Sequence, residues 1–389
     1  MPWEETNRME QKEKFVAEML KREKPFKKLC VDYGISEKTG YKWKNRFYEE
    51  GNQGLYEQSK APKNNPKALS ETTVINIINL KSKHPHWGPK KIEEIYKRTF
   101  KNEDTPSLSS IKRVLNKAQL VKKQRVRKTS PDNGNRLRKH IPAEKQNDVW
   151  AIDFKGWWMS DGEKCLPLTV RDLYSRKIMT IRLLKRTDAE AVRAVLTDLF
   201  KKYGLPKVIR SDNGVPFASS NGVLSLTCLS AWWITLGILP DRTEKGSPGQ
   251  NGSLERMHAD MAREIEGKVG GGIAENQRVI DEWVKEYNAV RPNEAIGMQT
   301  PDELYTPSER KYAGDFDSLT YPFGFLTRKA FKTGEIVIGG LRVSISSSLR
   351  GLYLGLRPKD NNIYDVFLAD FFLGTLDMNF CCFEPLANV

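Results

Sequence analysis

Three carboxylates in the second half of the chain have positions that suit metal-dependent chemistry. Asp153 lies inside the apolar segment VWAIDF, which predicts a strand, and a buried carboxylate costs free energy unless it is paired or metal-bound. Asp212 ends a second predicted strand, KVIRSD, just before an Asn-Gly turn. Glu255 follows the loop GSPGQNGS and opens a predicted helix. Because α/β sheets place their sites at the carboxyl ends of strands, these side chains are candidates for one site.

A set of oxygen ligands of this kind predicts hard divalent cations. Mg²⁺ prefers oxygen, and two such ions about 4 Å apart assist the attacking and leaving oxygens of phosphoryl transfer. Taken singly, Asp153 also fits a paired core residue, Asp212 a turn, and Glu255 an ordinary acid in a first helical turn. His258 follows Glu255 by one turn, and we predict that it faces the site in a structural or DNA-contact role, because Mg²⁺ disfavours nitrogen.

The elements that must position these residues predict an α/β domain. Strands are expected in DVWAIDFKGWW, KCLPLTVRD, KIMTIRLL and PKVIRSD, with a helix over 188–204 before the fourth strand. A second helix over 225–237, a short strand over 238–243 and a long helix from about Ser253 follow. Three strands and then alternating helices and strands predict a mixed sheet in an α/β sandwich. From about residue 320, short strands with glycine turns predict a small all-β domain, a barrel or a sandwich.

The first 50 residues predict a helix-turn-helix domain. Helices are expected over 10–21, 26–33 and 36–48, with Gly34 ending the second helix and Ser36 capping the third. The tight glycine turn between two short helices is typical of this motif. The third helix would be the recognition helix. Its Trp43 and Phe47 would face the core of the domain. Its residues predicted to contact DNA are Lys38, Lys42, Asn45 and Arg46. A plain three-helix bundle is the alternative, and the Lys and Arg content favours DNA binding.

Composition divides the rest of the chain and suggests its partner. We expect a linker over 51–69, a second helix-turn-helix-like unit over 70–120, a basic linker over 121–147, the α/β domain over 148–310 and the β domain over 320–389. The net charge is +15; residues 1–147 hold 34 basic and 18 acidic residues, and the remainder has a net charge of −1. A positive segment joined to a neutral body indicates a polyanion partner.

Several classes of protein are disfavoured by the same sequence. No apolar run approaches the ~20 residues of a membrane helix, and the first residues lack the apolar segment of a signal peptide. The five cysteines form no disulfide framework. No GxxxxGK[ST] motif occurs, so ATP is not expected. We therefore expect a cytoplasmic protein without a membrane partner.

Six segments resemble bacterial insertion-sequence transposases that contain a retroviral-integrase-like domain. AIDFKG, IRSDNGVPFAS and PGQNGSLERMH resemble the three catalytic motifs of that family, and YNAVRPNEAIGMQTPDELY resembles its downstream signature. YGISEKTGYKWKNRF and HWGPKKIEEIY resemble its DNA-binding domains. The resemblance covers about residues 1–310. It implies a ribonuclease-H-like core with an Asp-Asp-Glu triad at Asp153, Asp212 and Glu255, which are 59 and 43 residues apart.

The resemblance also implies an activity. A transposase of this kind binds the terminal inverted repeats of a mobile element, cleaves a phosphodiester with two Mg²⁺ or Mn²⁺ ions and joins the 3′-OH to target DNA. We expect a homo-oligomer on DNA, associated with the bacterial nucleoid, with Gln250 and Asn251 near the DNA end. Ala262 and Asn293 depart from the family pattern, in which a basic residue and a histidine are common. A DNA-binding relative without activity, acting as a repressor, and a structure-specific nuclease are the alternatives.

Overall fold

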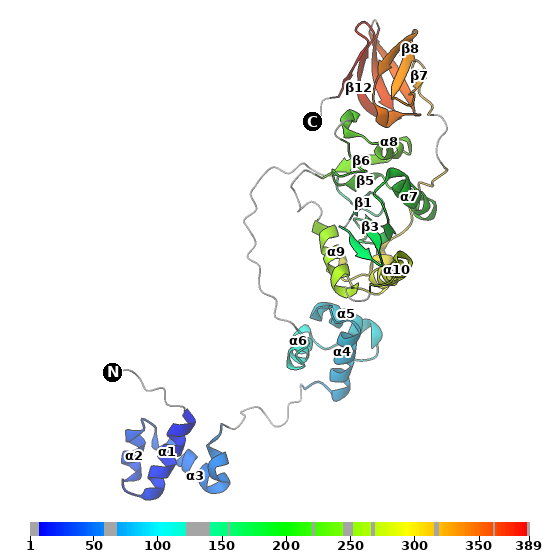
Figure 1. Cartoon of the computed structure of the whole chain (residues 1–389). Coiled ribbons are helices and arrows are strands. Elements are labelled where there is room, and N and C mark those ends of the chain that lie inside the picture. The colour runs from blue at the N-terminus through cyan, green and yellow to red at the C-terminus, as the bar shows by residue number, and fades with distance from the viewer. Residues whose placement is uncertain are drawn as a thin grey trace. The chain divides into compact units, whose positions relative to one another are not determined.

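The chain divides after Ala68 into two units, Met1–Ala68 and Leu69–Val389 (Figure 1). The computed structural model describes residues 8–57, 68–121, 141–154, 156–219, 222–243, 252–265, 269–314, 319–360 and 362–386. The predicted linker over 51–69 and the basic linker over 121–147 therefore lie partly outside the described residues, as do Gln250 and Asn251.

The first unit contains the three predicted helices. They are α1 (Arg8–Lys21), α2 (Phe26–Asp32) and α3 (Glu37–Glu50), followed by the 3₁₀ turn η1 (Gly51–Leu55). Gly34 has a φ of +64°, a conformation that glycine adopts without strain. Ser36 caps α3, since its hydroxyl oxygen accepts a hydrogen bond from the Thr39 N–H at 3.2 Å. The buried core consists of Phe15, Val16, Leu29, Cys30, Trp43 and Leu55.

The second unit begins with another group of three helices. They are α4 (Glu71–Lys83), α5 (Pro89–Thr99) and α6 (Leu108–Lys117), and Ser70 and Ser107 cap the first and the last. Their core includes Ile77, Trp87, Ile92, Tyr96, Ile111 and Leu115. Arg98 of α5 donates hydrogen bonds to Glu303 and to the carbonyl of Met298, so this group packs on the domain that follows.

A mixed sheet forms the centre of the second unit. Its strands are β1 (Val149–Phe154), β2 (Trp158–Ser160), β3 (Glu163–Asp172), β4 (Ile178–Leu184), β5 (Val208–Ser211) and β6 (Leu239–Arg242). The order is β2-β3-β1-β5-β6, with β4 also paired to β3. β3 is antiparallel to β1 and β4, whereas β5 is parallel to β1 and β6. The predicted strand over residues 148–158 is thus two strands, because β2 pairs with the start of β3 instead of extending β1.

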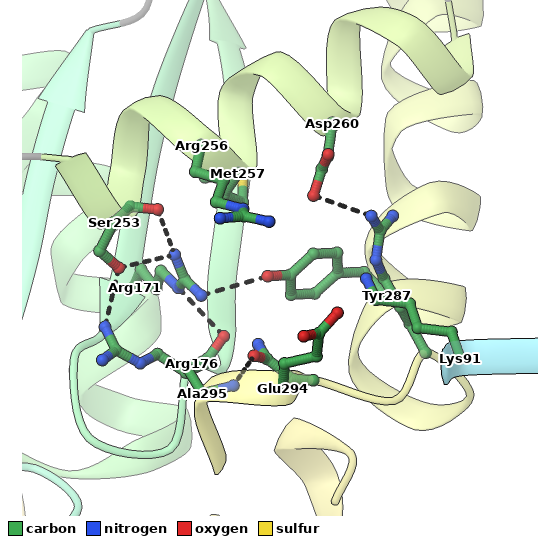
Figure 2. A pocket seen from close by; sticks show the side chains of 12 residues that line it. Lys91, Arg171, Arg176, Ser253, Arg256, Met257, Asp260, Tyr287, Glu294 and Ala295 are labelled. Atoms are coloured by element: carbon green, nitrogen blue, oxygen red, sulfur yellow. Dashed lines mark hydrogen bonds and ion pairs between the residues drawn. The ribbon is translucent and has the colours of Figure 1, made fainter. Parts of the chain in front are cut away.

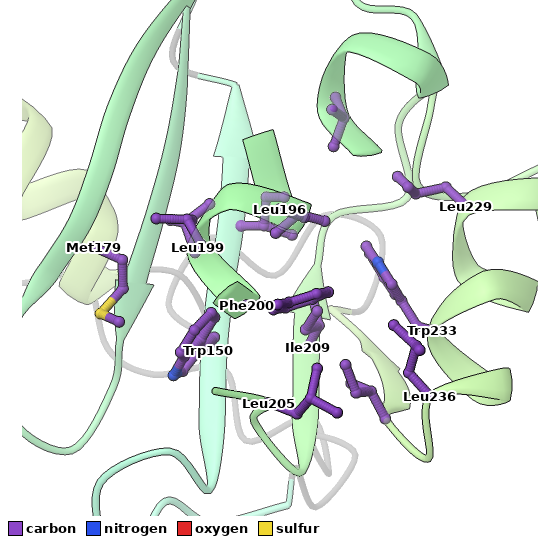
Figure 3. Close-up of a cluster of buried hydrophobic side chains, with 14 of the residues drawn as sticks. Trp150, Met179, Leu196, Leu199, Phe200, Leu205, Ile209, Leu229, Trp233 and Leu236 are labelled. Carbon is purple, nitrogen blue, oxygen red and sulfur yellow. The ribbon is translucent and has the colours of Figure 1, made fainter. Parts of the chain in front are cut away.

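Helices cover both faces of this sheet. They are α7 (Ala189–Tyr203), α8 (Cys228–Thr235), α9 (Gly252–Ile265), α10 (Ile273–Ala289) and the short α11 (Pro301–Leu304). Trp150 and Ile152 of β1 pack with α7 and α8 in one core, part of which Figure 3 shows. Ala151, between them, packs in a second core with α9 and α10. Because side chains alternate along a strand, Asp153 is on the face that α9 covers.

The last part of the chain is rich in strands, as predicted. They are β7 (Leu326–Lys329), β8 (Glu335–Ile338), β9 (Leu341–Ser344), β10 (Tyr353–Asp360), β11 (Ile363–Leu368), β12 (Phe371–Asp377) and β13 (Cys382–Pro385). Five of them form an antiparallel sheet in the order β13-β12-β11-β10-β7, and β8 pairs with β9. Ala231 and Ile234 of α8 pack into the core of this sheet. Across the described ranges, every helix is too short or too polar to span a bilayer.

Candidate active site

Strand register brings Asp153 and Asp212 to one edge of the sheet. β1 and β5 are parallel, and Ala151 lies opposite Arg210. Each aspartate follows its member of this pair by two residues, so both lie on the same face, level with one another, at the carboxyl ends of neighbouring strands. This register supports the predicted site shared by Asp153 and Asp212.

The turn after β5 fixes the Asp212 side chain. Its Oδ1 accepts a hydrogen bond from the Gly214 N–H at 3.1 Å. A Cβ on Gly214 would lie 3.0 Å from Asp212 Oδ2, so a larger residue would crowd this carboxylate. The Asn213 amide donates a hydrogen bond to the carbonyl of Thr243, just after β6. These contacts hold Asp212 between the ends of two strands.

His258 connects the first strand of the site to the helix that contains Glu255. The imidazole is buried, with Nε2 2.9 Å from Thr169 Oγ1 and Nδ1 4.0 Å from Asp153 Oδ2. Thr169 is the β3 partner of Asp153 in the sheet. His258 therefore lies beside the Asp153 carboxylate.

Two buried arginines anchor α9, and sequence reasoning missed both. Arg171 of β3 donates hydrogen bonds to the carbonyl and the hydroxyl of Ser253, at 2.8 and 3.1 Å, two residues before Glu255. Arg291 donates to Asp260 at 2.8 Å and to Glu264 at 2.6 Å, on later turns of the same helix. The available signal was an arginine within the apolar segment KCLPLTVRD, since a buried charge needs partners.

The charges of Asp212 and Glu255 repel the Asp153 carboxylate. Burial, the negative charge of Asp212 and, less strongly, that of Glu255 together raise the pKa of Asp153 to about 6. The Phe154 N–H acts in the opposite direction. Glu255 itself is exposed on the first turn of α9. A divalent cation would relieve this repulsion.

The donor set fits Mg²⁺ or Mn²⁺ by its chemistry, because all three candidate ligands are carboxylates. In the part of the chain that the structure describes, however, no group of three or more His, Cys, Asp or Glu side chains is close enough together to hold a metal ion. The carboxylates therefore influence one another electrostatically without forming a ready-made ligand cage.

The predicted DNA-contact residues of α3 are placed as the amphipathic pattern requires. Trp43 is 6% exposed and Phe47 packs partly into the core. On the outer side, Lys38, Lys42 and Asn45 are exposed and Arg46 is half-buried. The Lys42 ammonium lies 4.5 Å from the centre of the Trp43 ring, a cation–π contact.

Comparison with known families matches this arrangement of domains. Family models for an integrase core domain match residues 143–248 and 236–301. A helix-turn-helix model matches residues 11–63, and a homeodomain-like model matches residues 39–115.

Two curated relatives come from insertion elements. The uncharacterized 39.2 kDa protein of insertion element IS476 from Xanthomonas euvesicatoria is 25% identical over 61% of this chain and 66% of its own length. The uncharacterized 31.7 kDa protein of IS407 from Burkholderia multivorans is 27% identical over 41% of this chain and 55% of its own length. The chain is therefore similar to insertion-element proteins and carries a match to the integrase core domain. It spans less than two thirds of the length of either relative.

Solved structures with detectable similarity include retroviral integrases. The HTLV-2 integrase catalytic core domain in complex with magnesium is 13% identical, with a TM-score of 0.33, and covers 42% of this chain and 99% of its own. A simian T-cell lymphotropic virus intasome chain, in a complex with a PP2A regulatory subunit, is 14% identical with a TM-score of 0.36, and covers 76% of this chain and 97% of its own.

Proposed function

We propose that the chain is an active DNA transposase that cleaves the ends of a mobile element and joins them to target DNA. The observation that supports this most strongly is the register of β1 and β5, which brings Asp153 and Asp212 together on the face that α9 covers with Glu255. The integrase-core match supports the same class of reaction, phosphoryl transfer on a polynucleotide.

In this proposal Asp153, Asp212 and Glu255 hold two Mg²⁺ or Mn²⁺ ions. When bound, such ions stabilise the attacking and leaving oxygens of an in-line phosphoryl transfer. Asp212 is held by Gly214 and the turn after β5. His258 aligns the strands with α9 through Thr169, and its imidazole acts as a positioning group.

DNA recognition is assigned to the helical parts. Helix α3 would read the terminal inverted repeats through Lys38, Lys42, Asn45 and Arg46, three of which are exposed. Gln250 and Asn251 would contact the DNA end before Glu255. The division into domains at 1–50, 70–120, 148–310 and 320–389 and a homo-oligomer on DNA are parts of the same proposal.

The test is a cleavage and strand-transfer assay on a duplex carrying the end of the element that encodes the chain. Asp153→Asn, Asp212→Asn and Glu255→Gln should each reduce Mg²⁺-dependent cleavage by at least ~10³-fold, because the amide keeps the shape and removes the ligand charge. DNA binding should persist. Asp198→Asn is the control, since Asp198 is an exposed acid on α7.

Near wild-type cleavage by any of the three variants would remove that residue from the proposed triad. A wild-type chain that binds DNA but never cleaves it would favour the competing function, a DNA-binding protein without chemistry. The lack of a preformed metal cage among the described residues is the observation that favours this competitor.

A further inference from the structure

A basic pocket of about 360 Å³ lies beside the first turns of α9 (Figure 2). Its wall comes from α9, α10, β3, the β3–β4 turn, the loop after α10 and the first turn of α5. Ser253 and Arg256 line the pocket, two residues before and one residue after Glu255. None of the three carboxylates of the proposed triad lines this pocket. Its five basic residues are Lys91, Arg171, Arg176, Arg256 and Arg291.

Among the residues that the structure describes, the acids of the pocket form an ion pair with only one of these five cations. Asp260 is paired with Arg291 at 2.8 Å, and Glu294 is paired with Lys90, outside the pocket, at 3.1 Å. Across the described ranges, the other four basic residues of the pocket have no carboxylate partner within 4.0 Å: Lys91, Arg171, Arg176 and Arg256. The pocket therefore has an excess of positive charge close to Glu255.

The hydrogen-bond donors of the pocket are also incompletely used. Within the described part of the chain, the buried Arg171 donates only to neutral acceptors: the Ser253 carbonyl and hydroxyl, the Arg176 carbonyl and the Tyr287 hydroxyl (Figure 2). Arg176 donates from Nη1 to the Ser253 hydroxyl, but its buried Nε has no hydrogen-bond partner among the described residues. A buried N–H without an acceptor costs free energy, so an acceptor from outside the chain that bonded to this donor would be stabilised.

Lys91 adds a cation from the second group of helices. Burial and, less strongly, the nearby charge of Arg291 lower the pKa of Lys91 to about 8, and Asp260, Glu264 and Glu294 oppose this decrease. An anion in the pocket would reverse this unfavourable balance. Arg256, which lines the pocket from α9, is exposed, so an anion can approach from solvent.

We propose that this pocket binds one phosphate of the DNA backbone next to the scissile strand end. The assignment rests on the proposed function, and it adds a specific contact between the DNA, α9 and α5. A phosphate has the charge and the several acceptor oxygens that Arg176 Nε, Arg256 and Lys91 require. Since Arg256 follows Glu255 directly, a phosphate held here places the strand relative to the proposed metal ligands.

The test compares the salt dependence of DNA binding by the full chain and its variants. Each lost phosphate contact lowers the slope of log K against log salt by about 0.9 for duplex DNA. The variant with Arg176→Gln and Arg256→Gln should show this decrease and a roughly tenfold loss of affinity at physiological salt. Lys91→Gln, which leaves the buried arginines intact, should lower the slope as well. Arg278→Gln, an exposed arginine on α10 outside the pocket, should leave the slope unchanged.

The outcomes separate this assignment from the proposed function. Unchanged slopes in folded pocket variants, verified by thermal melts, would overturn the pocket assignment while leaving the transposase proposal intact. No DNA binding by the wild-type chain would overturn both. A second arm titrates inorganic phosphate by calorimetry: micromolar binding that the pocket variants lose, with unchanged DNA slopes, would show a site for free phosphate and overturn the DNA assignment.

Discussion

The Asp153 carboxylate is held where its charge is unfavourable in the folded chain. Burial and the negative charges of Asp212 and Glu255 raise its pKa to about 6 from the ordinary 3.8. A carboxylate whose pKa is raised by folding reduces stability above the folded pKa, and this penalty disappears below the unfolded pKa. At pH 7.5 the penalty is fully present, so the charged site lowers the stability of the fold and attracts cations.

We predict that Asp153→Asn stabilises the metal-free chain. In EDTA at pH 7.5 the free energy of unfolding should increase by about 1–3 kcal/mol, since one pKa unit corresponds to about 1.4 kcal/mol. Mg²⁺ should raise the Tm of the wild type and leave the Tm of the variant nearly unchanged. Differential scanning calorimetry with and without Mg²⁺ measures both effects. Equal Mg²⁺-induced shifts in the two proteins would show that Asp153 does not bind the ion.

The stability penalty of Lys91 changes with pH in the opposite direction to that of Asp153. Its pKa is about 8 in the folded chain and 10.5 ordinarily, so the unfolded chain binds this proton more tightly. The resulting loss of stability is complete below pH 8 and vanishes as the pH approaches 10.5. Lys91→Met should therefore raise the free energy of unfolding by about 1–2 kcal/mol at pH 7, after allowance for partial exposure, and by much less at pH 10.

The control for this change is Lys90→Met. Lys90 is exposed and forms a surface ion pair with Glu294, so its replacement should alter stability by less than about 1 kcal/mol at either pH. Chemical denaturation at pH 7 and pH 10 compares the two variants. A stabilisation by Lys91→Met that is the same at both pH values would contradict the assigned pKa.

At the scale of elements, local signals were sufficient for most helices and strands. Ser36 caps α3 as predicted, because a cap depends on residues within one turn. Alternation along β1 puts Asp153 on the same face as Ala151, which packs in the core with α9 and α10. The anchoring of Ser253 by Arg171 could not be predicted, because the two residues are 82 positions apart and meet only through the packing of α9 on β3.

The anchoring of α9 by Arg291 leads to a prediction at this scale. Arg291 is 5% exposed and donates hydrogen bonds to Asp260 and Glu264, so Arg291→Ala removes the cation of Glu264 and leaves Asp260 with the exposed Arg263. We expect a loss of about 3 kcal/mol in the free energy of unfolding, together with faster amide exchange in α9. Arg263→Ala is the matched control: Arg263 is an exposed partner of Asp260 at 3.7 Å and should cost less than about 1 kcal/mol. Equal losses in the two variants would disprove the anchoring role.

At the scale of the whole molecule, charge and recognition are distributed differently between the two units. Residues 1–68 contain 15 basic and 11 acidic residues, a net charge of +4, whereas residues 69–389 have a net charge of +11. Sequence-independent affinity for DNA depends on the number of phosphates neutralised. The predicted recognition helix α3, however, lies in the first unit. General affinity and sequence discrimination should therefore be separable.

We predict that residues 69–389 keep most of the affinity for random duplex DNA and lose the preference for the element's end. Residues 1–68 should bind more weakly, with a shallower salt slope, yet prefer the element's end. In the full chain, Lys42→Ala with Asn45→Ala should reduce that preference by ~10–100-fold, since a good base contact contributes about 1–3 kcal/mol, and leave random binding within about threefold. Competition binding with specific and scrambled duplexes measures these differences. Should 69–389 alone retain the full preference, sequence reading belongs to α4–α6, and α3 contacts only phosphates.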